Sequence, residues 1–141
     1  MKHASHGGQV TRDDSATEYV KREIEAADHD LVRARDSLGD GDFKWATIQA
    51  YYVGFHSIRA LLFSRGYRER SHYCLIQAIY ALFVDEGLLE SSLLRHLEIV
   101  KSLREKADYA SDFSAAGAER SLAVAHTLLD RAKSLCGMPL P

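Results

Sequence analysis

Residues 42–65 constrain the fold more than any other stretch, because they are apolar almost all the way round a helix. At 100° per residue, one arc of about 60° carries aromatic and cationic side chains, namely Trp45, Tyr52, His56, Arg59 and Phe63. A separate stripe holds small residues, against which another helix can pack closely: Ala46, Ala50, Val53, Ser57, Ala60 and Ser64. A helix with so little polar surface belongs at the centre of a protein. The polar groups within it therefore need partners.

Helix start and stop signals divide the chain into five helices joined by short connections. Acidic or hydroxyl side chains stand at the expected starts, and glycine follows the end of the central helix. The expected helices cover residues 13–37, 42–65, 71–87, 91–107 and 114–135. Residues 67–70 are expected to form a basic loop. No alternating β-branched run competes, so the sequence predicts an all-α fold, an up-and-down helical bundle of four to five helices.

The length of 141 residues predicts a single domain. We expect residues 1–12 to be a disordered N-terminal tail, residues 13–136 to form the helical domain, and residues 137–141 to be a C-terminal tail. No run of residues is apolar enough for a transmembrane helix, and the first residues lack the apolar stretch of a secretory signal. The sequence therefore predicts a cytoplasmic protein that does not enter a membrane.

Charge is distributed unevenly, although the net charge is only −2. Residues 56–72 contain four arginines, two histidines and one acid. Such a segment can attract a phosphate, whereas the whole surface is not basic enough to coat nucleic acid. The only Glu-x-x-His pair, Glu69 with His72, lies largely in the expected loop, so we expect no metal site and no cofactor.

Several positions, taken in order, resemble those of a known family. They are Tyr51-Tyr52-x-x-Phe55-His56-x-x-Arg59-Ala60-Leu61-Leu62, then Gly66, Ser71-His72, Gly87-Leu88-Leu89 and Leu103-Arg104-x-x-Ala107-Asp108-Tyr109. Together they resemble the HEPN domain, whose name stands for "higher eukaryotes and prokaryotes nucleotide-binding". The similarity extends over about residues 14–135.

This resemblance implies a helical bundle that forms a homodimer. Many prokaryotic members are encoded beside a minimal nucleotidyltransferase and act as one half of a toxin–antitoxin pair. Others are metal-independent endoribonucleases, in which an arginine and a histidine a few residues later meet at the dimer interface. Here Arg65 is separated from His72 by six residues, and Arg68 lies closer.

Two hypotheses follow for the candidate catalytic residues Arg65, Arg68 and His72. In a ribonuclease, His72 would take the proton of a ribose 2′-hydroxyl and one of the two arginines would stabilise the charged transition state. In a binding module, His72 would instead contact a neighbouring loop or a second subunit. We favour a dimeric subunit that binds a nucleotidyltransferase partner together with a nucleotide or RNA, and keep the ribonuclease as the alternative.

A nucleotide pocket is predicted from aromatic rings, which can stack a base, and from the cations near them. Its expected members are Tyr52, His56, Arg59, Arg104, Asp108 and Tyr109. The alternative is structural: Arg59 pairs with a carboxylate such as Asp108, while Tyr52 or a backbone carbonyl holds His56.

Overall fold

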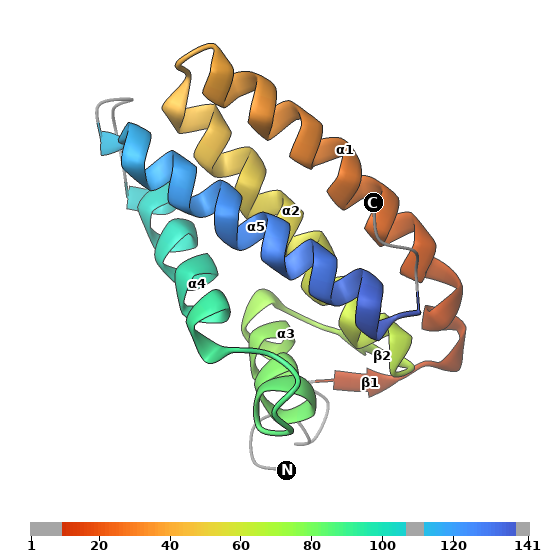
Figure 1. Cartoon of the computed structure of the whole chain (residues 1–141). Coiled ribbons are helices and arrows are strands. Elements are labelled where there is room, and N and C mark those ends of the chain that lie inside the picture. The colour runs from red at the N-terminus through yellow and green to blue at the C-terminus, as the bar shows by residue number, and fades with distance from the viewer. Residues whose placement is uncertain (1–9, 107–111, 138–141) are drawn as a thin grey trace.

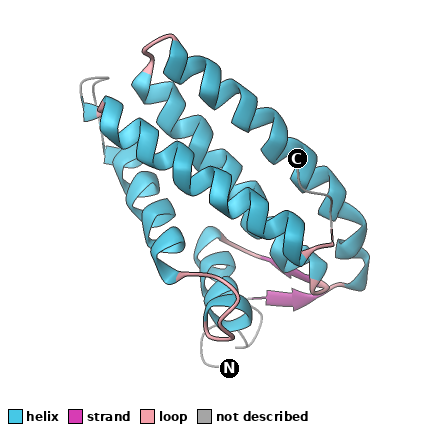
Figure 2. Ribbon diagram, in the orientation of Figure 1, coloured by secondary structure: helices cyan, strands magenta, loops and turns pink. Residues whose placement is uncertain are grey.

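The structure, a computed structural model, describes residues 10–106 and 112–137. Within these ranges it contains five α-helices and one sheet of two short strands (Figure 2). The helices are α1 (Val20–Gly39), α2 (Phe43–Ser64), α3 (His72–Ile79), α4 (Ser91–Lys106) and α5 (Ala115–Leu135). The strands are β1 (Val10–Arg12) and β2 (Tyr67–Glu69). None of the helices described is long and apolar enough to cross a lipid bilayer.

The central position expected for α2 is confirmed, because this helix packs against each of the other four helices. Figure 1 shows α1 and α4 running in one direction and α2 and α5 in the other, with α3 and the sheet at one end of the bundle. The predicted all-α, up-and-down bundle is therefore confirmed.

Short polar side chains cap α2 and α3 at their expected starts. The carboxylate of Asp42 accepts a hydrogen bond from the backbone N–H of Trp45 at 3.2 Å, and the Ser71 hydroxyl accepts one from Cys74 N–H at 3.1 Å. These contacts satisfy N–H groups that have no partner inside the helix. Gly66 follows α2 with a φ of +80°, a conformation that side-chain-bearing residues rarely adopt. The Ser71 cap matters most here, because it places His72 in the first turn of α3.

Close packing around α2 depends on a residue without a side chain. A Cβ atom at Gly54 would lie 2.5 Å from a methyl carbon of Leu97 on α4 and 3.2 Å from one of Leu128 on α5. Real carbon atoms do not approach so closely, so α4 and α5 reach α2 here only because the position is glycine.

The two strands correct the sequence prediction at one end of the bundle. Residues 10–12, expected within a disordered tail, form β1, and residues 67–69, expected within a loop, form β2. The strands pair antiparallel, with Val10 opposite Glu69, and Asp13 N–H donates to the Gly66 carbonyl at 2.7 Å. Partners so far apart in sequence leave no local periodicity, which is why the pattern of neighbouring residues did not reveal them. Residues 14–19 also differ from expectation, since they form a 3-10 turn before α1 begins.

Candidate functional site

His72 lies between α2 and α3, where it packs on two aromatic rings of α2. Its imidazole is nearly parallel to the ring of Phe55, with the centres 5.9 Å apart and the planes at 8°. The ring of Tyr51 stacks beside it at 6.2 Å. His72 Nδ1 and the Tyr51 hydroxyl also share a hydrogen bond of 3.3 Å. The imidazole is thus held by stacking and by one polar contact.

The surroundings of His72 favour its neutral form. Burial lowers the pKa of His72, the charge of Lys101 lowers it further, and Glu105 opposes these effects in part. Burial also raises the pKa of Tyr51 to about 12, so its hydroxyl keeps its proton at neutral pH. His72 Nε2 is buried and has no hydrogen-bond partner among the described residues. An unpartnered buried nitrogen is uncommon and marks this imidazole as a candidate functional group.

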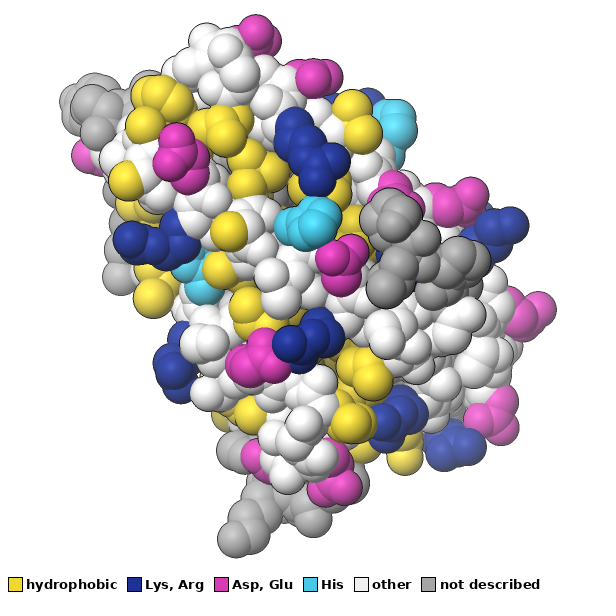
Figure 3. Space-filling model, viewed as in Figure 1, with side chains coloured by type: hydrophobic (Ala, Val, Ile, Leu, Met, Phe, Trp, Pro, Cys, Tyr) yellow, Lys and Arg dark blue, Asp and Glu magenta, His cyan; other side chains and the backbone are white. Residues whose placement is uncertain are grey.

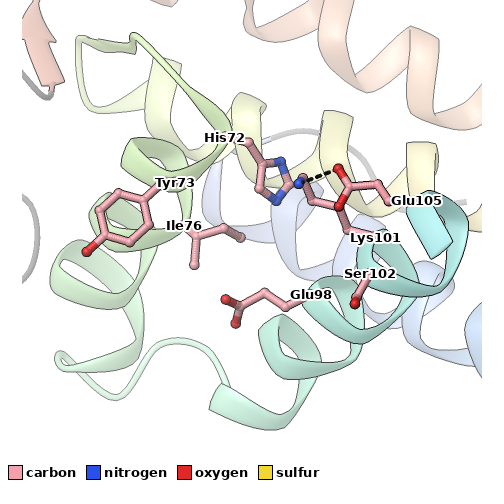
Figure 4. A pocket seen from close by; sticks show the side chains of 7 residues that line it. All are labelled: His72, Tyr73, Ile76, Glu98, Lys101, Ser102 and Glu105. Carbon is pink, nitrogen blue, oxygen red and sulfur yellow. Dashed lines mark hydrogen bonds and ion pairs between the residues drawn. The ribbon is translucent and has the colours of Figure 1, made fainter.

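A pocket of about 270 Å³ opens beside His72, between α3 and α4. It is lined by His72, Tyr73, Ile76, Glu98, Lys101, Ser102 and Glu105. Figure 4 shows His72 directed from α3 toward Lys101 and Glu105 on α4, which form an ion pair at 2.9 Å. The pocket therefore brings a neutral imidazole, a hydroxyl, a lysine and two carboxylates to one opening.

Arg104 extends this group of residues along α4. Its guanidinium lies over the rings of Tyr51 and Tyr52, 5.4 and 5.3 Å from their centres. It also donates a hydrogen bond of 2.7 Å to the Tyr52 hydroxyl. We define the His72 cluster as Tyr51, Tyr52, His72, Lys101 and Arg104. Within the described residues, Arg104 makes no ion pair with a carboxylate.

A second polar group lies on the other side of Phe55. His56 Nδ1 donates to the carboxylate of Glu23 at 2.9 Å. Arg59 lies 3.3 Å from the same carboxylate oxygen, and its Nε lies 2.8 Å from Glu69, an ion pair that is not aligned as a hydrogen bond. We define the Glu23 cluster as Glu23, His56, Arg59 and Glu69. It contains its own counter-charges.

The residues predicted to form one nucleotide pocket are thus divided between the two clusters. Tyr52 and Arg104 belong to the His72 cluster, whereas His56 and Arg59 belong to the Glu23 cluster. Phe55 connects them, since its ring contacts both His56 and His72 and lies under Arg59. The other two predicted members, Asp108 and Tyr109, lie outside the described residues.

The arginines predicted to act with His72 have other contacts in the structure. Arg65 lies 4.4 Å above the ring centre of Phe83. Arg68 lies between the rings of Tyr19 and Phe63, at 5.3 and 5.1 Å. Among the described residues, the cations that act on the pKa of His72 are Lys101 and Arg104. Sequence spacing therefore places Arg65 and Arg68 near His72 along the chain, but the fold does not bring them into contact with it.

Four residues of the two clusters were absent from the predicted sites, and one of them, Glu69, was named only in the Glu-x-x-His pair. Lys101 precedes Arg104 by three positions, so its place on the same helix face was available as a signal. Tyr51 was named only among the positions that resemble the HEPN domain. Glu23 carried no signal, since an acid on an amphipathic helix is ordinarily exposed, yet here it is only 7% exposed. Within the described residues, no set of three or more histidine, cysteine or acidic side chains is arranged to hold a metal ion.

A larger hollow of about 500 Å³ lies between α1 and α5 but gathers no comparable set of groups. Where this hollow continues between the same two helices, the charged side chains pair with one another. Lys133 lies 2.9 Å from Asp28, and His126 lies 3.5 Å from Asp130. Figure 3 shows this face, where acidic and basic side chains are interspersed and neither sign dominates. The His72 cluster is therefore the stronger candidate site.

Comparison with known proteins agrees with the fold and with the resembling positions. The model of the HEPN domain matches residues 20–137. The toxin candidate MJ0605 of Methanocaldococcus jannaschii is 33% identical over 95 residues, which is 67% of this chain and 71% of that protein. The UPF0332 protein PH1297 of Pyrococcus horikoshii is 30% identical over 80 residues, 57% of this chain and 56% of its own length.

A solved structure supports the fold alone. The crystal structure of TT1696 from Thermus thermophilus matches with a TM-score of 0.68 and 21% identity. The match covers 83% of this chain and 98% of that one. Because the family model also covers most of the bundle described above, this chain belongs to the HEPN domain family.

Proposed function

We propose that this chain is the toxin-like member of a two-protein pair and that it binds the phosphate of a nucleotide or RNA at the His72 cluster. The observation that carries the proposal is the different state of two arginines. Arg59 is neutralised by Glu23 and Glu69, whereas Arg104 rests on aromatic rings with no carboxylate partner among the described residues. A guanidinium in that state is suited to a phosphate.

The other groups of the site support the same ligand. Lys101 lies at the rim of the pocket and provides a second positive charge, although Glu105 shares it. Ser102 lines the same pocket and offers a hydroxyl. The neutral His72 can donate or accept a hydrogen bond, according to which nitrogen carries its proton. These groups suit a single phosphate better than a long duplex, which would need a wider basic surface.

Binding of a short RNA tests this proposal directly. The fluorescence anisotropy of an end-labelled 12-nucleotide RNA is measured with the parent protein, with a Lys101→Ala/Arg104→Ala double variant, and with Arg95→Ala. Arg95 is a matched control, since it is an exposed arginine on the same helix. We expect the double variant to bind at least tenfold more weakly and Arg95→Ala to bind as the parent does. Equal loss in both would contradict a phosphate site at this position.

The pairing and the homodimer are the parts of the proposal that rest on the family. The relative MJ0605 is named as a toxin candidate, and the family resemblance implies a nucleotidyltransferase partner. We expect expression of this chain in a bacterial host to arrest growth. Co-expression of a nucleotidyltransferase encoded beside it should relieve the arrest, and light scattering should give the mass of a dimer. A monomer at micromolar concentration would remove any site shared by two subunits.

A metal-independent ribonuclease is the second candidate, favoured by the neutral imidazole of His72. His72 would remove the proton of a ribose 2′-hydroxyl, whose oxygen attacks the adjacent phosphorus as the 5′-oxygen leaves with a proton. The products would be a 2′,3′-cyclic phosphate and a 5′-hydroxyl. Arg104, rather than Arg65 or Arg68, would stabilise the charge on the transition state in the arrangement described above.

Cleavage of a mixed RNA pool in excess EDTA separates the two candidates. Cleavage by the parent protein and not by His72→Ala, leaving cyclic phosphate ends, would establish the ribonuclease. If both proteins bind the RNA and neither cuts it, the chain acts by binding alone.

A further inference from the structure

Trp45 is the only tryptophan of the chain, and its side chain is half exposed in the first turn of α2. Tyr52 lies on the same face of the helix, two turns or about 10.5 Å further along, and is 36% exposed. Exposed aromatic rings on one face of a helix offer flat surfaces on which a base can stack. Asp42 caps α2 at the N–H of Trp45 itself, so the position of the indole is anchored to a fixed helix start.

Positive charge lies beside the second of these rings. Arg104 donates to the Tyr52 hydroxyl at 2.7 Å and covers part of that ring, and Lys101 lies one helical turn before it on α4. Farther along this face of α2, no further ring is exposed. Arg59 lies seven residues beyond Tyr52 and is paired with acids, and Phe63 is only 1% exposed. Along this face of α2, exposed rings are therefore found in the first half of the helix, where Arg104 contacts one of them.

We propose that unpaired bases of RNA stack on Trp45 and Tyr52, while the phosphates that join them contact Arg104 and Lys101. This inference rests on the function proposed above and names its substrate class as single-stranded RNA. Every base has two flat faces that can stack on an aromatic ring, but in a duplex those faces are covered by neighbouring bases. A platform of this kind therefore binds single strands with little regard to sequence and rejects the duplex.

The emission of Trp45 provides a direct test, because no other tryptophan contributes to it. The protein is titrated with a 12-nucleotide single-stranded RNA, and with the same strand annealed to its complement, while indole fluorescence and anisotropy of the labelled RNA are recorded together. We expect the single strand to quench Trp45 with the same dissociation constant that anisotropy gives. The duplex should leave the emission unchanged.

Three variants define the contribution of the ring. Trp45→Ala should weaken binding of the single strand about tenfold, which is about 1.4 kcal/mol, whereas Trp45→Phe, which keeps an aromatic ring, should retain most of the affinity. Val32→Ala serves as the control, since Val32 is an exposed apolar residue of α1, 56% exposed. It should bind as the parent does.

The outcomes separate this inference from the function on which it rests. RNA that binds by anisotropy without quenching Trp45, and binds Trp45→Ala equally well, would overturn the stacking platform and leave the phosphate site intact. Absence of any RNA binding would overturn both. Emission that changes with protein concentration in the absence of RNA, together with loss of self-association in Trp45→Ala, would show that a second copy of the chain covers Trp45, and would also overturn the platform.

Discussion

The Glu23 cluster and the His72 cluster lie on the two sides of Phe55, and each contains a histidine and an arginine. In the Glu23 cluster, one carboxylate that is 7% exposed holds both His56 and Arg59. In the His72 cluster, the imidazole has a buried nitrogen without a partner among the described residues, and Arg104 lies on rings instead of acids. The Glu23 cluster contains the carboxylates that pair with its cations, although Arg59 Nε is not aligned for a hydrogen bond, whereas Arg104 has no ion pair among the described residues.

This difference teaches that residue type alone does not distinguish a structural cluster from a binding site. The balance of charge within each cluster distinguishes the two. A group whose charge is already neutralised has little to gain from a ligand, whereas a cation held on apolar rings gains a partner when a phosphate arrives. The comparison therefore predicts that changes in the Glu23 cluster reduce stability, and that changes in the His72 cluster reduce binding.

The largest effect should follow from Glu23→Ala. It leaves His56 and Arg59 beside each other without the acid they share, and we expect the free energy of unfolding to fall by about 2–3 kcal/mol. Urea unfolding at pH 7 measures it. Glu105→Ala removes an exposed acid beside the His72 cluster and should leave the midpoint unchanged. If both variants unfold at the same urea concentration, the two clusters do not differ as described.

Arg104→Ala should produce the next largest effect, on binding and not on stability. We expect the affinity for single-stranded RNA to fall about tenfold, and the slope of log affinity against log salt concentration to decrease by about 0.7, the value for one lost phosphate contact. Arg59→Ala is the matched variant from the Glu23 cluster. It should unfold more easily, yet while folded it should bind RNA within about twofold of the parent protein.

A smaller effect is expected when His72 gains a proton. Because burial and Lys101 lower the pKa of His72 from its usual 6.5, the imidazole is neutral at pH 7 and becomes charged only at lower pH. The added charge should strengthen RNA binding about fivefold at 0.1 M salt. Anisotropy titrations between pH 7.5 and pH 5 measure the change. His72→Gln should remove the increase, and an undiminished increase in that variant would assign it to another group.

The smallest effect concerns the pH dependence of stability. A histidine whose pKa is lower in the folded state binds its proton more readily when the chain is unfolded, so acid favours unfolding. For His72, the stability is complete above pH 6.5 and is lost as the pH falls through the lowered pKa. His96, also buried, should contribute in the same direction. Replacing each by asparagine should flatten the decline of urea midpoints between pH 6.5 and pH 5. The change in slope should correspond to less than one proton taken up on unfolding per variant.

Much of the fold could be predicted because its signals are local. Asp42, Ser71 and Gly66 act on their own neighbours, and the apolar circumference of α2 follows from periodicity alone. The strands could not be predicted in this way, since Val10 pairs with a residue beyond two helices. The same limit applied to the site. Arg104 and Tyr52 were both selected as polar or aromatic positions, but only the fold shows that Arg104 accompanies His72 and that Arg59 meets Glu23 instead.

The pairing of β1 with β2 also sets an order of folding. Two helices separate the partners, so a long loop must close before a few backbone hydrogen bonds form, and such contacts arise late. The bundle of α1 and α2 must be in place first, and β1 then docks on β2 as one of the last steps. β2 leads directly through Ser71 into α3, whose first turn carries His72. We therefore expect the core to form before β1 docks, and amide hydrogen exchange should find β1 opening more readily than α2.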